Sequence, residues 1–164
     1  MKQSMINLQP DMHFSYSQFF VYDKSVVTPG CEWTKAHSDQ GFARRDSSVA
    51  VGTLLEYGTA KVVVVMCPYK PQEEYERVIA VPFLVCSGKV VVDGPEEADI
   101  GRTFALPSGN YRLVAAQQKL GDKEEVIHLF CESVMKPLEQ SEVILADEAL
   151  SPPTPLIETA RVAE

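Results

Sequence analysis

The sequence predicts an all-β protein, an antiparallel two-layer β-sandwich of about seven or eight strands with at most one or two short helices. Three observations lead to this class. Apolar runs rich in Val, Phe and Tyr recur along the chain, and clusters of Gly, Pro, Asn and Asp separate them. No stretch repeats apolar residues at the spacing of a long amphipathic helix. A closed barrel is the alternative architecture.

The strands of the first half follow from residue type and alternation. Residues 13–22 are rich in aromatic side chains and begin with an alternation typical of a strand with one buried face. Residues 49–51 lead to a turn, and the β-branched run 61–67 predicts a strand covered on both faces. Pro68 and Pro71 end that strand because proline cannot donate to a β-ladder.

The strands of the second half alternate with short turns. Because such turns are too short for crossover connections, we expect antiparallel pairing throughout. The one place for a short helix is 34–40, where Thr34 can cap the first turn. The predicted strands are 77–86, 89–92, 102–106, 111–117 and 126–131.

Composition divides the chain into a sandwich domain, residues 1–137, and an acidic, Pro-rich C-terminal tail, residues 138–164. The last 28 residues hold one basic and six acidic side chains, which is −5 of the net charge of −8. Prolines at 152, 153 and 155 indicate a stiff, extended linker, so we expect a mobile or partner-bound tail. The tail could also cover an edge strand or exchange onto a neighbour, which makes a homo-oligomer possible.

Several classes of function are disfavoured by composition. The chain has no basic stripe, so we expect no direct contact with nucleic acid. No apolar stretch is long enough to span a bilayer and no signal-peptide core is present, which predicts no membrane insertion and a cytoplasmic location. Its three histidines are far apart and no Cys-x-x-Cys occurs, so neither a metal nor another cofactor is expected. We expect reduced thiols rather than disulfides at Cys31, Cys67, Cys86 and Cys131.

Catalytic motifs are missing as well. The sequence has no nucleophile elbow, P-loop or dinucleotide fingerprint, which favours a protein without enzymatic activity. Two alternatives remain open. One is an enzyme that uses Cys31, in a polar and exposed setting, with His37 nearby. The other is a sugar or small-molecule module with an aromatic platform of Trp33, Phe42 and Tyr57.

Two acidic runs are the candidate partner-binding surface. Because complementary charge speeds encounter and suppresses wrong partners, acidic loops suit a basic protein. The residues are Glu73, Glu74 and Glu76 in the first run and Asp93, Glu96, Glu97 and Asp99 in the second.

A second cluster precedes the long strand region and contains the single tryptophan. We expect it to form a pinned loop that closes one end of the sandwich, with one arginine paired to Glu32 or Asp46. Its anchor residues are Glu32, Trp33, Phe42, Arg44, Arg45 and Asp46.

The order and spacing of these features resemble the competence protein J family, inhibitors of a bacterial DNA-entry nuclease. The matching elements are the aromatic strand 14–22, Glu-Trp-Thr at 32–34, Gly-Phe-Ala at 41–43, the strand 62–65, Val-Pro-Phe-Leu-Val at 81–85 with Gly88, and 104–113. The resemblance covers about residues 13–134. It implies a non-enzymatic protein whose partner is an endonuclease, a basic one that meets the acidic loops.

Overall fold

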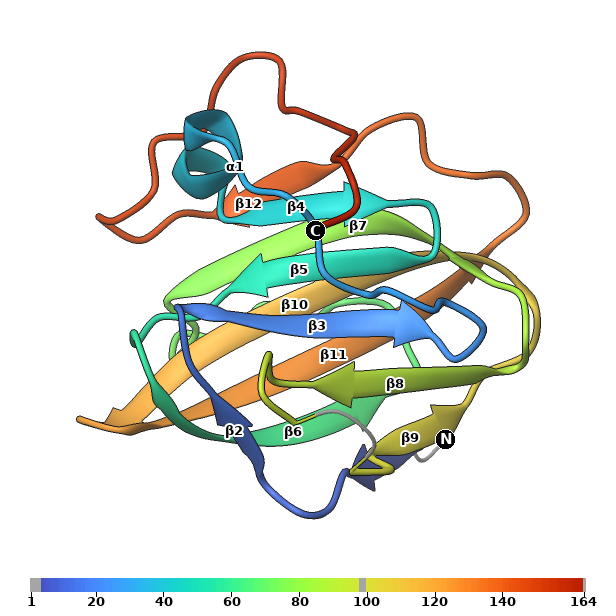
Figure 1. Ribbon diagram of the computed structural model, residues 1–164, viewed down its shortest axis with the longest axis horizontal. Coiled ribbons are helices and arrows are strands. Elements are labelled where there is room, and N and C mark those ends of the chain that lie inside the picture. The colour runs from blue at the N-terminus through green and yellow to red at the C-terminus, as the bar shows by residue number, and fades with distance from the viewer. Residues whose placement is uncertain (1–3, 98–99, 164) are drawn as a thin grey trace.

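The computed structural model describes residues 4–97 and 100–163, and within them two β-sheets pack face to face (Figure 1). One sheet has seven strands in the order β1-β6-β11-β10-β7-β12, with β2 also paired to β6, and the other has five in the order β4-β5-β3-β8-β9. The elements are β1 Met5–Asn7, β2 Met12–Phe14, β3 Gln18–Asp23, α1 Lys35–Gln40, β4 Phe42–Arg45, β5 Ser48–Gly52, β6 Gly58–Val65, β7 Arg77–Val85, β8 Lys89–Asp93, β9 Thr103–Ala105, β10 Gly109–Gly121, β11 Glu124–Val134 and β12 Glu142–Leu145. The predicted all-β sandwich with one short helix is therefore confirmed, with more strands than expected.

Alternation along the strands fills the space between the sheets. In β3, every second residue is buried, so Phe19 and Val21 face the core while Phe20 and Tyr22 face outward. The long β10–β11 hairpin is buried on both faces: Leu113 and Leu129 join the central cluster, and Val114, Ala116 and Phe130 belong to a second buried cluster. Burial of this apolar surface is the main favourable term for folding.

Helix α1 has the ends that the sequence predicts. The Thr34 hydroxyl accepts a hydrogen bond from the His37 amide, and His37 Nδ1 accepts one from the Thr34 amide, which together form a capping box. Gly41 ends the helix at φ 86°, a left-handed conformation that favours glycine. A Cβ at Gly41 would also meet Ile79 Cδ1 at 3.0 Å and Leu150 at 3.2 Å, so the helix packs closely against β7.

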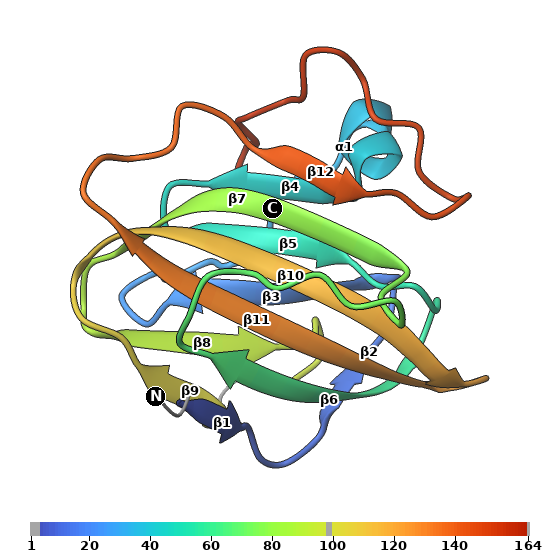
Figure 2. The ribbon, with the colours of Figure 1, turned by 180° about the vertical axis from the view of Figure 1, so that it is seen from behind.

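One strand pair contradicts the expectation of purely antiparallel pairing. Strands β6 and β11 are parallel, with Thr59 opposite Glu124 and Val65 opposite Phe130. The β10–β11 hairpin is inserted between β6 and β7, so the chain from β6 must cross the sheet before it can begin β7. Residues 66–76 form this crossover, which passes in front of β11 and β10 (Figure 2). Its prolines had suggested only the end of a strand.

The C-terminal residues pack against the sandwich. Strand β12 pairs with β7 and extends the larger sheet. The chain then passes α1 and reaches the smaller sheet, where Val162 forms an antiparallel bridge with Cys31 (Figure 1). Among the arrangements expected for the tail, which were mobile, partner-bound or covering an edge strand, the structure shows β12 covering the edge of β7. Main-chain groups of residues 157–163 also find hydrogen-bond partners on the body. Within the described residues no helix has the length and apolar character to cross a bilayer.

Candidate partner-binding surface

The crossover 66–76 presents the first acidic run on the outer face of the larger sheet. Glu73 and Glu74 are exposed, and neither carboxylate has a hydrogen bond or ion pair among the described residues. The next residue, Tyr75, is only 5% exposed and packs against His128 and Phe130 of β11. The two carboxylates are therefore neighbours on one solvent-facing segment, with an apolar anchor directly after them.

Aromatic contacts hold this segment in place. The Tyr75 hydroxyl pairs with His128 Nδ1 at 2.6 Å, and the rings of Tyr69 and Phe130 meet edge to face at 5.4 Å. Burial raises the pKa of Tyr75 to about 12 and lowers the pKa of His128. Both side chains are therefore neutral near pH 7, and the hydrogen bond joins a phenol to an uncharged imidazole.

Glu76 closes the crossover and does not share the exposure of its neighbours. Its carboxylate accepts from the Lys119 amide at 2.7 Å and lies 3.8 Å from Lys119 Nζ. Glu76 thus fixes the segment to β10, and the solvent-facing charge of the first run is that of Glu73 and Glu74.

The second acidic run is mostly not on the surface, which corrects the prediction for Asp93 and Glu97. Both residues are buried, at 3% and 8% exposure, and both contact Arg102, whose side chain is fully buried. Glu96 is exposed, and Asp99 lies outside the described residues. A buried guanidinium needs acceptors, and these two carboxylates supply them.

Arg102 is the centre of a polar cluster that joins three segments. Its guanidinium donates to Asp93 and Glu97 at 3.2–3.4 Å, and to main-chain carbonyls that belong to β8 and to the turn between β1 and β2. These carbonyls are Val92 O at 2.9 Å, Pro10 O at 2.8 Å and Asp11 O at 3.4 Å. The acids at 93 and 97 therefore hold the fold together instead of meeting a partner.

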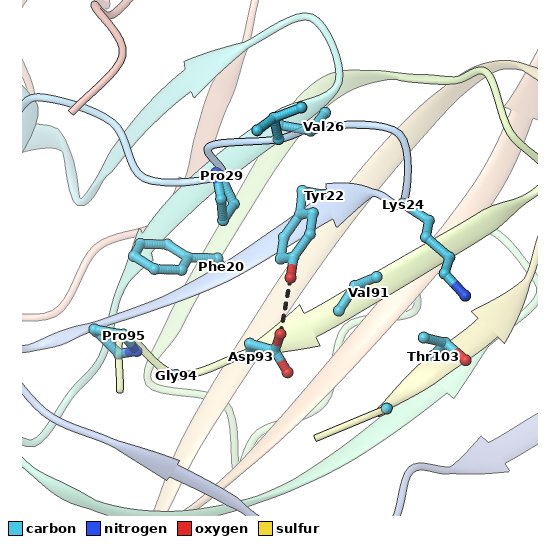
Figure 3. A pocket seen from close by; sticks show the side chains of 12 residues that line it. Phe20, Tyr22, Lys24, Val26, Pro29, Val91, Asp93, Gly94, Pro95 and Thr103 are labelled. Atoms are coloured by element: carbon cyan, nitrogen blue, oxygen red, sulfur yellow. Dashed lines mark hydrogen bonds between the residues drawn. The ribbon is translucent and has the colours of Figure 1, made fainter. Parts of the chain in front are cut away.

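A hollow of about 500 Å³ lies over the outer face of the smaller sheet, beside Asp93 (Figure 3). Phe20 and Tyr22 from β3 and Val91 from β8 form its floor, and Lys24 stands at its rim. The Tyr22 hydroxyl donates to Asp93 Oδ2 at 2.8 Å. Because Asp93 also accepts from Arg102, its carboxylate is occupied by the protein itself.

The predicted loop anchors lie on the segment before α1, on β4 and directly after β4. Trp33 Nε1 donates to Gln18 Oε1 at 2.8 Å, and Phe42 is fully buried in the central core. Arg44 Nη2 lies 4.0 Å from Asp46 Oδ1. Burial lowers the pKa of Arg44, and the negative charges of Glu158 and Asp46 offset only part of this shift.

The other two anchors differ in their contacts. Arg45 donates to the carbonyls of Thr28 and Gly30. Glu32 is exposed, and its main-chain amide donates to the carbonyl of Arg161, whereas its carboxylate takes no part in this contact. Arginine therefore fixes this region mainly through main-chain carbonyls.

Two alternative sites do not form from the residues that suggested them. Cys31 is 5% exposed in an apolar cluster with Ala43 and Ala50, which corrects the expectation of a polar, exposed thiol. Both ring nitrogens of His37 are engaged, by Thr34 and by the Thr159 carbonyl. The aromatic platform is also wrong, because the buried Phe42 cannot meet a ligand.

The four cysteines differ in exposure. All four cysteines are free, with Cys131 buried and Cys86 exposed. Burial raises the pKa of Cys131 to about 12, so this thiol stays protonated. Among the residues that the structure describes, no three His, Cys, Asp or Glu side chains converge as metal ligands would.

The family to which this chain belongs follows from its match to a family model. The family model of competence protein J (ComJ) matches residues 11–142, which include every strand from β2 to β11. The chain belongs to the competence protein J family. The resemblance in the order of sequence features is thereby confirmed.

Relatives of the family place the chain among known proteins. The DNA-entry nuclease inhibitor of Bacillus subtilis (strain 168) is 24% identical over 103 residues, 63% of this chain and 76% of that protein. The crystal structure of ComJ from B. subtilis, described as an inhibitor of the DNA degrading activity of NucA, is similar with a TM-score of 0.68 at 21% identity. The match spans 82% of this chain and all of the ComJ chain, so the two proteins share the sandwich fold.

A second solved structure has the same architecture. The protein of crocagin biosynthetic gene J matches 79% of this chain and 98% of its own length, with a TM-score of 0.51 and 14% identity. At this identity the likeness concerns the fold alone. The ComJ sandwich is therefore found in proteins of quite different sequence.

Proposed function

We propose that this protein inhibits a DNA-cutting endonuclease by direct contact and has no catalytic activity of its own. The support is its membership of the competence protein J family, together with the relatives named as a DNA-entry nuclease inhibitor and as an inhibitor of NucA. The buried Cys31 and fully engaged His37 are consistent with a binding protein.

The observation that carries a contact surface is the pair Glu73 and Glu74 on the crossover. A nuclease binds phosphates through basic side chains, and two adjacent carboxylates offer the same charge to those side chains. The pair is pre-organised, because Tyr69 and Tyr75 fix the segment on the sheet and Glu76 fixes its end. Pre-organisation lowers the entropy lost on binding.

The experiment is inhibition of DNA cleavage by B. subtilis NucA, with full-length protein in excess. We expect inhibition that is strongest at low ionic strength, because salt screens exposed charges. Full nuclease activity at low salt with excess inhibitor would contradict the proposed function.

A matched pair of variants tests the surface separately. Glu73→Gln/Glu74→Gln should raise the concentration for half-inhibition about tenfold or more, equivalent to about 1.4 kcal/mol. Glu139→Gln/Glu148→Gln removes the same charge from exposed positions outside the crossover and should change it little. Equal effects of the two pairs would rule out the crossover as the contact and leave the inhibitory function standing.

A further inference from the structure

The segment 157–163 lies extended against α1, β4 and residues 30–32. Gln40 binds Ile157 through both ends of its amide, since Oε1 accepts from the Ile157 amide at 2.8 Å and Nε2 donates to the Ile157 carbonyl at 2.9 Å. Arg44 Nη1 donates to the Glu158 carbonyl at 3.0 Å, and His37 Nε2 meets the Thr159 carbonyl at 2.9 Å. Three consecutive residues of the segment are thus bound through their main chain.

A short β-bridge continues this contact. The Glu32 amide donates to the Arg161 carbonyl at 2.8 Å, and the Ala163 amide donates to the Gly30 carbonyl at 3.1 Å. Val162 forms the bridge with Cys31. The segment therefore adds main-chain pairing in the way that an extended peptide joins the edge of a sheet.

The side chains of the segment contribute little to this recognition. Thr159, Arg161 and Val162 are exposed. The residues that bind the segment, Gln40, His37, Arg44 and 30–32, are called the groove. The Glu158 carboxylate does not bind the groove; it accepts hydrogen bonds from the amide and hydroxyl of Ser141. What the groove recognises is an extended main chain, with apolar contact at Ala160.

The groove side chains are buried and held by the body of the protein. Gln40, His37 and Arg44 are 0%, 4% and 8% exposed. Gln40 Nε2 also donates to the Phe42 carbonyl, and His37 Nδ1 accepts from the Thr34 amide, so both are oriented without the segment. Without a peptide in the groove, Gln40, His37 and Arg44 lose the main-chain partners that the segment supplies. The groove therefore suits an occupant with main-chain donors and acceptors.

The occupant is connected in a way that permits exchange. The groove residues lie inside the family match, which ends at residue 142, whereas the segment lies beyond it. Residues 146–156 join β12 to the segment and contain three prolines. Fully extended, this connection spans roughly 40 Å, enough to reach an adjacent molecule.

We propose that the groove formed by Gln40, His37, Arg44 and residues 30–32 is a peptide-binding site, which residues 157–163 of a second copy occupy in exchange with the chain's own segment. The second copy fits because it carries the one sequence already seen in the groove. Such exchange forms a dimer with no new contact surface. It does not depend on nuclease inhibition.

Disulfide trapping tests the exchange in the full-length protein. A Cβ at Gly30 would lie 3.3 Å from Ala163 Cβ, close to the roughly 3.5–4.5 Å that a disulfide requires. We would mix Gly30→Cys with Ala163→Cys, each on a Cys67→Ser/Cys86→Ser background, unfold and refold them together, and oxidise. The expected result is a covalent dimer on a non-reducing gel, increasing with protein concentration.

Three controls make each outcome decisive. The double variant Gly30→Cys/Ala163→Cys in one chain should form an internal disulfide at low concentration, and its failure would overturn the groove contact. Asp122→Cys, on the exposed β10–β11 turn, should cross-link to Ala163→Cys at least tenfold more slowly than Gly30→Cys does. Adding Ile157→Pro to the Ala163→Cys chain removes the amide that Gln40 binds and should reduce the dimer about tenfold. Equal cross-linking at 30 and 122, or no dimer where the internal disulfide forms, would overturn the exchange.

Discussion

The two acidic runs look alike in sequence and have opposite positions in the molecule. Glu73 and Glu74 project into solvent from the crossover, whereas Asp93 and Glu97 lie inside and bind Arg102. Each run is flanked by turn-forming residues, so local sequence does not distinguish them. The difference is the presence of a cation: an arginine that is itself buried requires carboxylates, and the nearer run supplies them.

The comparison separates two uses of negative charge. Inside the protein, a carboxylate has a large effect on stability because its partner would be left unpaired. On the surface, a carboxylate has a small effect on stability and remains available for another molecule. Substitutions at the two runs should therefore be separable by whether they change the free energy of unfolding or only binding.

The largest effect is expected for Arg102→Met. This substitution keeps an unbranched side chain but removes the guanidinium and leaves Asp93 and Glu97 buried without their cation, and it should reduce the free energy of unfolding by about 3–5 kcal/mol in urea denaturation. Arg112→Met is the matched control, because Arg112 lies 3.6 Å from a mostly exposed Glu142. It should cost less than about 1 kcal/mol. Similar losses for both arginines would contradict the comparison.

A smaller effect is expected at Asp23, a buried carboxylate satisfied without arginine. Burial alone would raise the pKa of Asp23, but hydrogen bonds from Ser25, Ser87 and Cys86 outweigh it and lower the pKa to about 2 from 3.8. Because the folded-state pKa is the lower one, the carboxylate stabilises the protein above pH 4 and this contribution is lost as the pH falls toward 2.

Asp23→Asn should therefore reduce the free energy of unfolding by about 2 kcal/mol at pH 7, with the gap to the unmodified protein closing between about pH 4 and pH 2. Denaturation curves over this pH range measure the gap. Asp122→Asn, at an exposed turn, should show no comparable gap. A deficit at Asp23→Asn that stayed constant down to pH 2 would show that the loss is steric and not electrostatic.

The smallest effect on stability is expected for Glu73→Gln/Glu74→Gln. Both side chains are exposed and make no ion pair among the described residues, so the free energy of unfolding should change by less than about 0.5 kcal/mol. Thermal or urea unfolding of this pair beside the unmodified protein checks the value. A loss above 1 kcal/mol would mean that the crossover carboxylates are part of the fold, and the contrast with the second run would disappear.

Features that depend on neighbouring residues, such as turns and the helix cap, could be predicted from the sequence. The turn residues between strands were sufficient for the sandwich, and Thr34 was sufficient for the start of the helix. The prediction of one strand over residues 13–22 was wrong, because the chain turns at Tyr16 and Ser17, both at φ 57°, and divides this stretch into β2 and β3, which belong to different sheets. The crossover was missed because Pro68 and Pro71 end a strand in the same way whether the chain turns back or passes over the sheet. Strand neighbours such as β6 and β11 are chosen by long-range packing, which no short window contains.

The site was predictable to a similar degree. Charge alone marked both acidic runs, but only the burial of Arg102 assigns the second run to the interior. The peptide contacts of Gln40, His37 and Arg44 could not be predicted from the sequence, because these side chains bind main-chain atoms that every residue possesses. His37 and Arg44 were singled out only for other roles.

The crossover also has a consequence for how the protein is made. Strands β6 and β7 leave the ribosome before β10 and β11, yet the finished sheet separates them by those two strands. Until residues 109–134 arrive, the edge of β6 that pairs with β11 and the edge of β7 that pairs with β10 have no neighbours, and such edges are prone to association with other chains. The interval between translation of β7 and closure of the hairpin is thus the period when this nascent chain most needs dilution or a chaperone.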